Sequence, residues 1–560
     1  MESLPTIEIS LQDFARLVGK QLSGSEVQNL LFGLKCEVAE SKEDRLTLDV
    51  LADRPDLLSA EGVAREVRGI LRLEEGLTKY HLATGPVSVT ADPAAVKVRP
   101  FIACGVLRGI SLNDESLRQA MQLQEKLHIT YCRKRRAASI GIYDLDTISP
   151  KIRYTALKPD EIRFRPLEKS TPLSGGEILK ETDQGRDYGG ILANFAKYPL
   201  LVDENGVVLS MPPIVNSEET KVNLRSRNLF VDVTGISERL VNKVLNILVC
   251  SLAERGGKLE SVKVSYPESK TSTPHLEPRI MKLRPSYANS SLGIHLTTAQ
   301  IAGHLKRMRF GANTSTAKSL TIQVPAYRVD VLGEIDLVED LAIAYGYDKF
   351  VPALPTGYTV GSELQRTRAA RLVVEAMVGL GFQEVLSFIM TNPHIQYELM
   401  GMKPVPHVEI QNPMSQEYSC LRTSLLPSIL NFLSENKHVS LPHKLFECGD
   451  VVIPDESEET FVRSERRVVA AIADNEVGYE DIQAVLYAFL HEFGVEFKLE
   501  RSVQPSLLTG RTGEVSIDGV LIGLLGEVNP TVLSNFELET PVAIFELNVD
   551  GLAQLLCRVK

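Results

Sequence analysis

The stretch TIQVPAYRVDVLGEIDLVEDLAIAYGY, Thr321–Tyr347, predicts a strand, a turn and a helix in succession. Its first part, Thr321–Val331, alternates apolar and polar residues and is rich in β-branched types, as strands are. From Glu334 the apolar residues recur at helical spacing, and Gly346 stands where a helix usually ends. The residues expected on the apolar face of this helix are Ile335, Val338, Leu341, Ala342 and Tyr345. The flanking regions of the chain are expected to form further modules on either side.

Four acidic residues gather on the other side of this predicted helix. Asp336, Glu339 and Asp340 stand at i, i+3 and i+4, an arc of roughly 100°, and Asp330 ends the preceding strand. One interpretation is an ordinary solvated helix start, because acidic residues interact well with the positive end of a helix. The other is a cation site, because closely packed carboxylates repel one another unless a hard cation such as Mg²⁺ lies among them.

The composition is that of a soluble globular protein with several domains. A chain of 560 residues is expected to fold as three to five domains. Hydrophobic residues make up 44% and charged residues 24%, and no apolar run reaches the roughly 18 residues of a membrane span. The N-terminus, MESLPTIEIS, has neither the basic nor the apolar region of a signal peptide, so we expect no membrane association and a cytoplasmic location.

Cysteine and histidine spacing excludes the commonest zinc sites. The seven cysteines form no CxxC pair, and their odd number does not suggest a disulfide framework. The ten histidines include no HExxH or HxH spacing. A net charge of −11 argues against broad nonspecific nucleic-acid binding, so any contact with nucleic acid is expected to be local.

Two stretches rich in Gly and Pro, residues 76–93 and 352–361, are predicted to link modules. Before the first lies a mixed α/β pattern, in which Asp56 or Ser59 is available to cap a helix. Strands dominate from about residue 95 to 250, and a small α/β or winged-helix-like unit follows, with a helix that begins at Thr297 or Thr298. After the second linker the pattern predicts a mixed, largely antiparallel sheet with helices.

A basic run and a polar segment stand out in the strand-rich part. Arg133, Lys134, Arg135 and Arg136 form the densest basic run of the chain, either a solvated loop or a contact to phosphate. After Met211-Pro212-Pro213, which interrupts strand pairing, come the polar residues Asn216, Ser217 and Glu218, followed by Asp232 and Thr234 on a short strand. Such residues form either loop surface or the floor of a pocket. No Ser/His/Asp spacing of a nucleophile elbow occurs, so hydrolysis here would need a positioned water.

Eight segments in order resemble the β-subunit family of archaeal/eukaryotic-type phenylalanine–tRNA ligases (phenylalanyl-tRNA synthetases). They are DRPDLLSAEGVARE (53–66), CRKRRAASIGIYDLDTI (132–148), VLSMPPIVNSEETKV (208–222), FVDVTG (230–235), VPAYRVDVLGEIDLVEDLAIAYGYDKF (324–350), LRTSLLPSILNFLSEN (421–436), LFECGDVV (445–452) and GLLGEVNP (523–530). The resemblance spans nearly the whole chain.

The resemblance implies an α+β multidomain fold. It places an N-terminal α+β domain in residues 1–90, a B3/B4-type tRNA editing domain in 91–270, a B5 domain with the acidic helix in 274–352, and a catalytically inactive, degenerate class II synthetase-like core with an antiparallel sheet in 360–560. In that core Glu447, Glu527 and Asn529 stand where a working class II site needs arginines for ATP, so we expect no ATP binding there.

The resemblance also implies a function and partners. The family forms an α₂β₂ tetramer whose α subunit uses ATP to attach phenylalanine to tRNA(Phe), and the β subunit hydrolyses mischarged tyrosyl-tRNA. The editing pocket is then expected at Leu201, Ser210, Asn216, Ser217, Glu218, Asp232 and Thr234. Glu218 or Asp232 is expected to accept the tyrosine hydroxyl, while Ser210 and Thr234 orient water.

By the same resemblance, residues 133–136 are expected to contact tRNA, and Asp330, Asp336, Glu339 and Asp340 to hold Mg²⁺ at a site shared with the α subunit. The family's bacterial members carry an N-terminal OB-type module and a C-terminal anticodon-binding extension, neither of which is expected in this sequence. Two alternatives stay open: a scaffold whose editing pocket has decayed, and a free-standing tRNA-binding or trans-editing protein.

Overall fold

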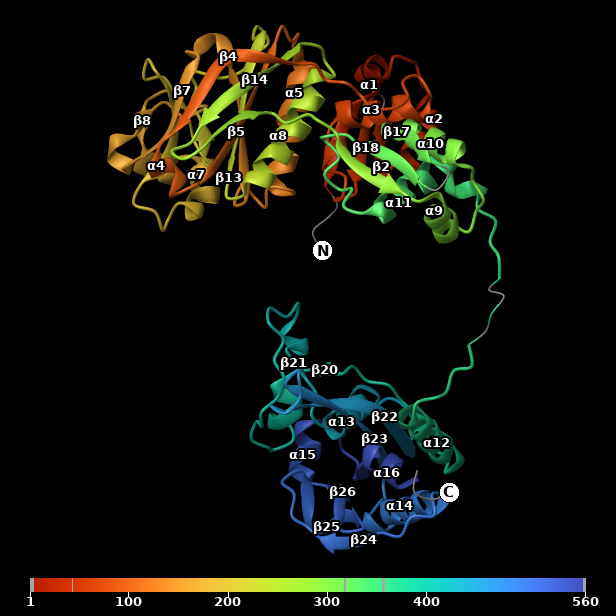
Figure 1. The fold of residues 1–560 in the computed structure, drawn as a ribbon. Coiled ribbons are helices and arrows are strands. Elements are labelled where there is room, and N and C mark those ends of the chain that lie inside the picture. Colours follow the sequence, from red (N-terminus) through yellow and green to blue (C-terminus); the bar gives the residue numbers. More distant parts are fainter. Residues whose placement is uncertain (1–4, 43, 317–318, 355–356, 358, 557–560) are drawn as a thin grey trace. The chain divides into compact units, whose positions relative to one another are not determined.

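A computed structural model describes residues 5–42, 44–316, 319–354, 357 and 359–556. The chain forms two compact units, Met1–Ala353 and Leu354–Lys560 (Figure 1), and each is described by itself. The boundary falls within the predicted linker at 352–361, part of which lies outside the described residues. Among the described residues, no helix is long and apolar enough to cross a membrane.

Unit 1 begins with a small antiparallel sheet covered by helices. Its strands, in the order β1-β3-β2, are β1 (Thr6–Ser10), β3 (Arg45–Val50) and β2 (Cys36–Lys42). Its helices are α1 (Leu11–Val18), α2 (Gly24–Phe32) and α3 (Ala60–Ile70). The Ser59 side chain accepts a hydrogen bond from the Gly62 amide, so Ser59, of the two predicted candidates, caps α3.

The second part of unit 1 is a ten-stranded sheet in the order β12-β11-β10-β7-β4-β14-β5-β13-β6, with β15 beside β14. The strands are β4 (Leu82–Ala91), β5 (Phe101–Arg108), β6 (Ala138–Asp144), β7 (Lys151–Leu157), β10 (Tyr198–Asp203), β11 (Val208–Met211), β12 (Val215–Asn216), β13 (Asn228–Gly235), β14 (Lys258–Ser265) and β15 (Lys270–Thr273). Two helices pack against this sheet, α5 (Asp114–Ile129) and α8 (Glu238–Ala253). The second part of unit 1 also contains the short helices α4 (Pro93–Val96), α6 (Gly175–Glu181) and α7 (Asp183–Tyr188) and the strand pair β8 (Arg163–Phe164) and β9 (Leu173–Ser174).

The prediction of a linker at 76–93 is wrong, because β4 lies in the middle of this sheet. β4 pairs in parallel with both β14 and β7. Every second residue of β4, Val87, Val89 and Ala91, is buried in an apolar cluster. This strand-like alternation determines the local structure in spite of the nearby Gly and Pro. Asn205-Gly206 lies in the turn of a hairpin, in which β10 and β11 pair antiparallel.

The third part of unit 1 contains the stretch Thr321–Tyr347. Its sheet has the order β16-β18-β17, with β16 (Arg279–Leu283), β18 (Ser319–Val324) and β17 (Gly311–Thr316), and its helices are α9 (Pro285–Leu292), α10 (Thr298–Arg307) and α11 (Glu334–Tyr345). Thr297 caps α10. The predicted strand to Val331 is too long, because Pro325 follows β18 and cannot donate to a ladder.

Helix α11 begins and ends as predicted, but its buried face differs from the predicted one. Gly346 closes the helix with φ +103°, a conformation that favours glycine. Ile335 is 53% exposed, whereas Asp340 is only 3% exposed. The prediction that Asp340 lies opposite the buried face is therefore wrong, and its burial calls for a charged partner.

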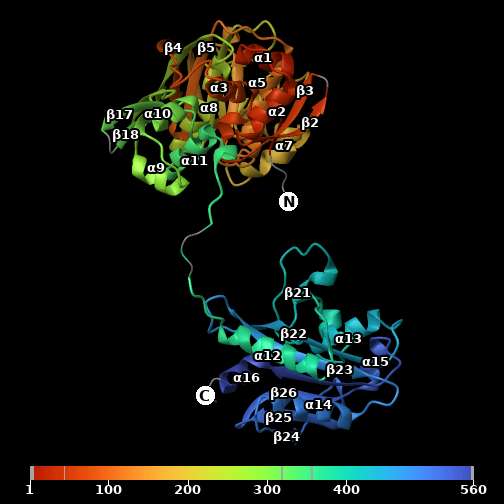
Figure 2. The ribbon, with the colours of Figure 1, turned by 90° about the vertical axis from the view of Figure 1, so that its right-hand side faces the viewer.

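One hydrophobic core joins the three parts of unit 1. It includes Leu48 from the first sheet, Leu245 and Val249 from α8, and Ile322 and Leu341 from the third part. Figure 2 shows α3, α5 and α8 alongside one another, and α3 contacts α8 and α10. The predicted domains 1–90, 91–270 and 274–352 thus pack around shared apolar surface.

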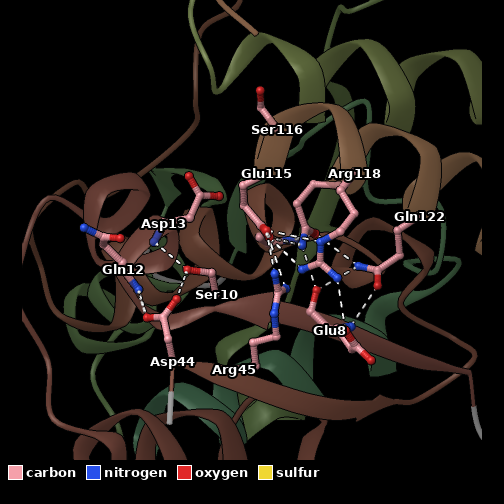
Figure 3. Close-up of polar contacts among 12 residues, drawn as sticks. Glu8, Ser10, Gln12, Asp13, Asp44, Arg45, Glu115, Ser116, Arg118 and Gln122 are labelled. Atoms are coloured by element: carbon pink, nitrogen blue, oxygen red, sulfur yellow. Dashed lines mark hydrogen bonds and ion pairs between the residues drawn. The ribbon is translucent and has the colours of Figure 1, made fainter. Parts of the chain in front are cut away.

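Polar contacts also fix α5 to the first sheet (Figure 3). Arg118 Nη1 lies 3.0 Å from Glu8 Oε2, and the Glu8 amide donates to Gln122 Oε1 at 2.8 Å. Arg45 Nη2 lies 3.5 Å from Glu115 Oε2 on the same helix. One face of α5 is therefore held by strands β1 and β3.

A buried set of charges links the first and third parts. Arg328 Nη2 lies 2.7 Å from Asp330 Oδ2 and 2.6 Å from Asp340 Oδ2. Arg54 pairs with Asp56 through two hydrogen bonds of 2.9 Å, and its Nη2 lies 3.4 Å from Glu66. Burial raises the pKa of Asp340, while the positive charges of Arg328 and Arg54 act to lower it.

An aromatic contact joins the same two parts of unit 1. The Arg65 guanidinium lies 3.7 Å from the ring centre of Tyr327. Both side chains are fully buried, so this cation–π contact is shielded from water.

Unit 2 is built on a seven-stranded sheet in the order β19-β22-β23-β27-β26-β25-β24. The strands are β19 (Gln383–Glu384), β22 (His443–Pro454), β23 (Val462–Ala473), β24 (Lys498–Arg501), β25 (Leu507–Ile517), β26 (Val520–Val528) and β27 (Val542–Asn548), and only β19 pairs in parallel. One buried cluster lies under α12 (Gln365–Gly379), α14 (Tyr479–Glu492) and α16 (Val549–Leu556), and a second under α13 (Leu426–Glu435) and α15 (Pro530–Asn535). The predicted mixed, largely antiparallel sheet is confirmed, and Asp518-Gly519 forms the turn of the hairpin between β25 and β26.

We expect Arg328→Met to destabilise unit 1 by about 3–5 kcal/mol, because it leaves Asp340 buried without its partner. Urea unfolding, monitored by the hydrogen exchange of peptides from α11, measures this loss of unfolding free energy. Arg284→Met is the matched control, because it removes the ion pair between the exposed Arg284 and Glu334 of α11. The loss of such an exposed ion pair is expected to have little effect on stability. Equal effects of the two substitutions would contradict the assignment.

Candidate functional site

Most of the predicted pocket residues lie on strands that the curved sheet brings together, and Ser217 and Glu218 follow the last of them, β12. Ser210 on β11 pairs with Leu201 on β10 and with Asn216 on β12. Asp232 on β13 pairs with Gly141 on β6, at the other end of the strand order. Since side chains from the two ends touch, the sheet curves until its ends approach each other.

The contact between the two ends is a buried polar centre. The Tyr143 hydroxyl on β6 donates to Asp232 Oδ1 at 2.6 Å and is hydrogen-bonded to Ser210 Oγ at 2.8 Å. Asp232 is 1% exposed, and this burial raises its pKa to about 7, while the Tyr143 hydrogen bond and the Arg99 charge act to lower it. A carboxyl with this pKa can hold or release a proton near neutral pH.

Thr234 lies next to this centre, in a second set of contacts. Its Oγ1 is 2.9 Å from Ser139 Oγ and accepts from Arg99 Nε at 3.1 Å. Arg99 Nη2 also donates to the Thr234 carbonyl and to the Arg135 carbonyl. Thr234 therefore holds Arg99 in place beside the centre.

Two hollows adjoin the polar centre. The smaller has a volume of about 20 Å³, which is room for one water molecule. Its polar lining comes from Arg135, Ser139, Tyr143, Ser210, Asn216 and Asp232. The larger, of about 420 Å³, is within the range of small-molecule sites. Leu117, Met121, Gln124 and Glu125 of α5 line it, and Arg135 and Asn216 line both hollows.

The structure thus brings together part of the predicted set. Ser210 and Asp232 line the smaller hollow, Ser217 the larger, and Asn216 both. Leu201, Glu218 and Thr234 do not line either one: Leu201 is in an apolar core, and Glu218 Oε2 accepts from the Glu168 amide. Sequence reasoning missed Tyr143, Ser139, Gly141 and the α5 residues. The only signal for them was small and polar residues alternating within the buried strand ASIGIYD.

The basic run divides into an inward and an outward part. Arg135 is in the pocket wall, where its Nη1 donates to the Ile214 carbonyl at 2.9 Å and its guanidinium lies 4.4 Å from the ring centre of Tyr188. Arg133, Lys134 and Arg136 are exposed. The prediction that these residues contact tRNA stays a prediction, and it concerns chiefly the three exposed ones.

The four acids of the α11 region have separate partners. Asp330 and Asp340 share Arg328, Glu339 Oε1 lies 2.9 Å from Lys35 Nζ, and Asp336 accepts the amides of Leu332 and Gly333. In the part of the chain that the structure describes, no three acidic, His or Cys side chains are grouped to hold a metal ion. The arrangement does not fit a magnesium ion held by this chain alone, and the site shared with an α subunit stays a prediction.

In unit 2 the acids of the predicted inactive core are paired with arginines. Glu447 on β22 is 1% exposed, with its Oε1 2.7 Å from Arg422 Nη1. Glu527 on β26 lies 2.7 Å from Arg511, and Asn529 caps α15. Arg422 is thus engaged inside the protein, where phosphate would have to displace a carboxylate.

Two known families match the chain. Residues 351–549 match the family described as phenylalanyl tRNA synthetase beta chain CLM domain, and residues 281–347 match the tRNA synthetase B5 domain. These ranges correspond to unit 2 and to the third part of unit 1.

Curated relatives match over almost the whole chain. The phenylalanine–tRNA ligase beta subunit of Thermococcus kodakarensis is 38% identical over 97% of this chain and 98% of its own length, and that of Methanocaldococcus jannaschii is 37% identical over 98% and 100%. A solved N-terminal fragment of the phenylalanyl-tRNA synthetase beta subunit from Pyrococcus horikoshii is 38% identical, with a TM-score of 0.60 over 61% of this chain and 100% of the fragment. At this identity and coverage, the chain belongs to the family of phenylalanine–tRNA ligase beta subunits.

Proposed function

We propose that this chain works with an α subunit in an α₂β₂ phenylalanine–tRNA ligase of the cytoplasm. In this proposal the α subunit binds ATP and attaches phenylalanine to tRNA(Phe), with release of AMP and diphosphate. The present chain supports that reaction and hydrolyses mischarged tyrosyl-tRNA(Phe) in unit 1. The relatives' name, beta subunit, supports a partner chain.

Exposed apolar side chains of unit 2 support the need for a partner. Leu386 is 78% exposed and Phe388 70% exposed, and both lie in unit 2. Large apolar side chains exposed together are typical of interaction surfaces. A free-standing tRNA-binding or trans-editing protein has no need for this surface.

The observation that carries the editing proposal is a buried carboxyl with a pKa of about 7 beside a hollow of one-water size. In the proposed step, a water in this hollow gives a proton to Asp232 while its oxygen attacks the ester carbonyl of tyrosyl-tRNA. The bond from the carbonyl carbon to the ribose oxygen then breaks, and that oxygen takes the proton. The products are tyrosine and tRNA with a free 3′ terminus.

A second site of this kind has a physical reason. An apolar pocket that accepts phenylalanine rejects tyrosine poorly, because it cannot strongly exclude an added hydroxyl. The larger hollow offers Gln124, Glu125, Asn216 and Ser217 as polar groups that can bind a phenol. The three exposed residues of the basic run, Arg133, Lys134 and Arg136, are proposed to contact tRNA phosphate.

We expect the combined change Asp232→Ala and Thr234→Ala to abolish editing but leave charging intact. Deacylation of preformed tyrosyl-tRNA(Phe) by the complex with its α subunit should fall roughly a hundredfold or more. Formation of phenylalanyl-tRNA, measured on the same preparation, should be unchanged because it takes place in the partner.

Glu218→Ala is the matched control, since Glu218 was the other candidate acid and its carboxyl lies outside both hollows. It should keep the parental deacylation rate. Unchanged deacylation by the double variant would exclude Asp232 and Thr234 from the editing reaction. If the parental complex showed no deacylation at all, the alternative of a scaffold with a decayed editing pocket would stand.

Unit 2 is proposed to be a degenerate class II synthetase-like core, and we expect it not to bind ATP. Glu447 and Glu527 bring negative charge to positions where a triphosphate needs arginine, and Arg422 is already paired. Isothermal titration of the chain alone with ATP should give no saturable heat. Saturable binding to this chain would contradict the degenerate-core proposal.

For magnesium, we expect the thermal unfolding midpoint of the chain alone to be the same with Mg²⁺ and with a chelator. The acids of α11 are already neutralised by Arg328, Lys35 and backbone amides. A midpoint that rises with Mg²⁺, and no longer does so in Asp336→Asn, would contradict this. Dissociation of the α/β complex by a chelator would instead support the shared site.

A further inference from the structure

Tyr143 stands at the centre of the candidate editing site although none of the predicted site residues pointed to it. It is 1% exposed, and its hydroxyl bonds to both Asp232 and Ser210. We infer that Tyr143 is a positioning residue of the editing site, which holds the Asp232 carboxyl against the one-water hollow. The inference deepens the proposed editing function and rests on it.

The close approach of the two side chains is built into the sheet. Gly141 lies opposite Asp232 in the pairing of β6 and β13. A Cβ atom at this glycine would stand 2.0 Å from the Tyr143 hydroxyl oxygen and 2.3 Å from Asp232 Oδ1. Tyr143 and Asp232 therefore meet in space that exists only because residue 141 has no side chain.

The groups that face Asp232 come from several strands. Tyr143 on β6 bonds to it, and Cys104 on β5 is its cross-strand partner. Tyr154 on β7 and Arg99, in the segment before β5, interact with it electrostatically. Burial raises the pKa of the Cys104 thiol and of the Tyr154 phenol, so both stay neutral near pH 7. The hydrogen bond from Tyr143 and the charge of Arg99 are the influences that lower the pKa of Asp232.

A positioning role has a consequence that a merely structural role lacks. Without the Tyr143 hydroxyl, the buried Asp232 carboxylate loses a hydrogen bond and its pKa rises further. The fraction of the carboxylate form, which accepts the proton of water, then falls at neutral pH. Editing should be recovered at higher pH, where Asp232 is ionised again.

The test is the deacylation rate of tyrosyl-tRNA(Phe) as a function of pH, with the complex of this chain and its α subunit and with spontaneous hydrolysis subtracted. Tyr143→Phe should raise the midpoint of the pH profile by about one unit and lower the rate at pH 7 roughly fivefold to tenfold. Phenylalanine charging should not change, which shows that the variant is folded and assembled.

Tyr266→Phe is the matched control, because it removes the hydroxyl of a tyrosine that packs against the same sheet but bonds to the backbone of Ile102 instead. Its midpoint should stay at the parental value. Gly141→Ala is a second variant, which separates the Tyr143 hydroxyl from Asp232 without removing a polar group and should also raise the midpoint.

Three results would overturn the inference. Parental rates and midpoint in Tyr143→Phe would show that the hydroxyl is dispensable. A rate reduced equally at every pH, with the midpoint unchanged, would show a structural role only. Absence of deacylation by the parental complex would overturn the proposed function, and the inference with it. The first two results, in contrast, concern Tyr143 alone and leave the proposed function intact.

Discussion

The pairing of the Arg328 guanidinium with two buried carboxylates is the interaction on which the arrangement of unit 1 depends. Arg328, Asp330 and Asp340 are nearly inaccessible to water, and a charge in such a place is stable only beside its opposite. Asp340 comes from α11, whereas Asp330 precedes that helix. The charges therefore fix how the stretch Thr321–Tyr347 folds back on itself, and Arg54 brings the first part of the chain to the same place.

The consequence reaches the candidate editing site through the shared core. α8 packs on strands β5 and β13, and α3 contacts both α8 and α10. α5 has one face on β1 and β3, while its Leu117, Met121 and Gln124 line the larger hollow. The wall of that hollow is therefore positioned partly by the first sheet, although the polar centre belongs to the ten-stranded sheet.

Sequence patterns predicted what depends on neighbouring residues and missed what depends on distant ones. The limits of α11 and a helix cap at Asp56 or Ser59 follow from local chemistry and were predicted, and the structure has Ser59 as the cap. The burial of Asp340 was not, because its partner Arg328 neutralises a position that helical periodicity alone marks as exposed. The sequence of β4 predicts a linker, because β7 and β14, the strands that pair with it, are remote in sequence.

The candidate site shows the same division. Ser210, Asn216 and Asp232 were found because their segments resemble a known family, and the structure places them around one polar centre. Tyr143 and Gly141 were missed, since their importance arises from the curvature that brings β6 to β11. Arg135 was expected among surface cations, but its contacts with Ile214 and Tyr188 bring it into the wall.

Burial also decides which of the two candidate acids suits proton transfer. Glu218 is near the surface, and the hydrogen bond from the Glu168 amide lowers its pKa, so it is a weak base near neutral pH. Asp232 has a pKa of about 7, higher than in an unfolded chain, so its contribution to folding stability is lost as the pH rises through that value. A buried carboxyl that destabilises the fold at neutral pH has no structural advantage over asparagine, which could accept the same hydrogen bond from Tyr143. Its ability to take a proton is what distinguishes it, and that property is typical of a catalytic position.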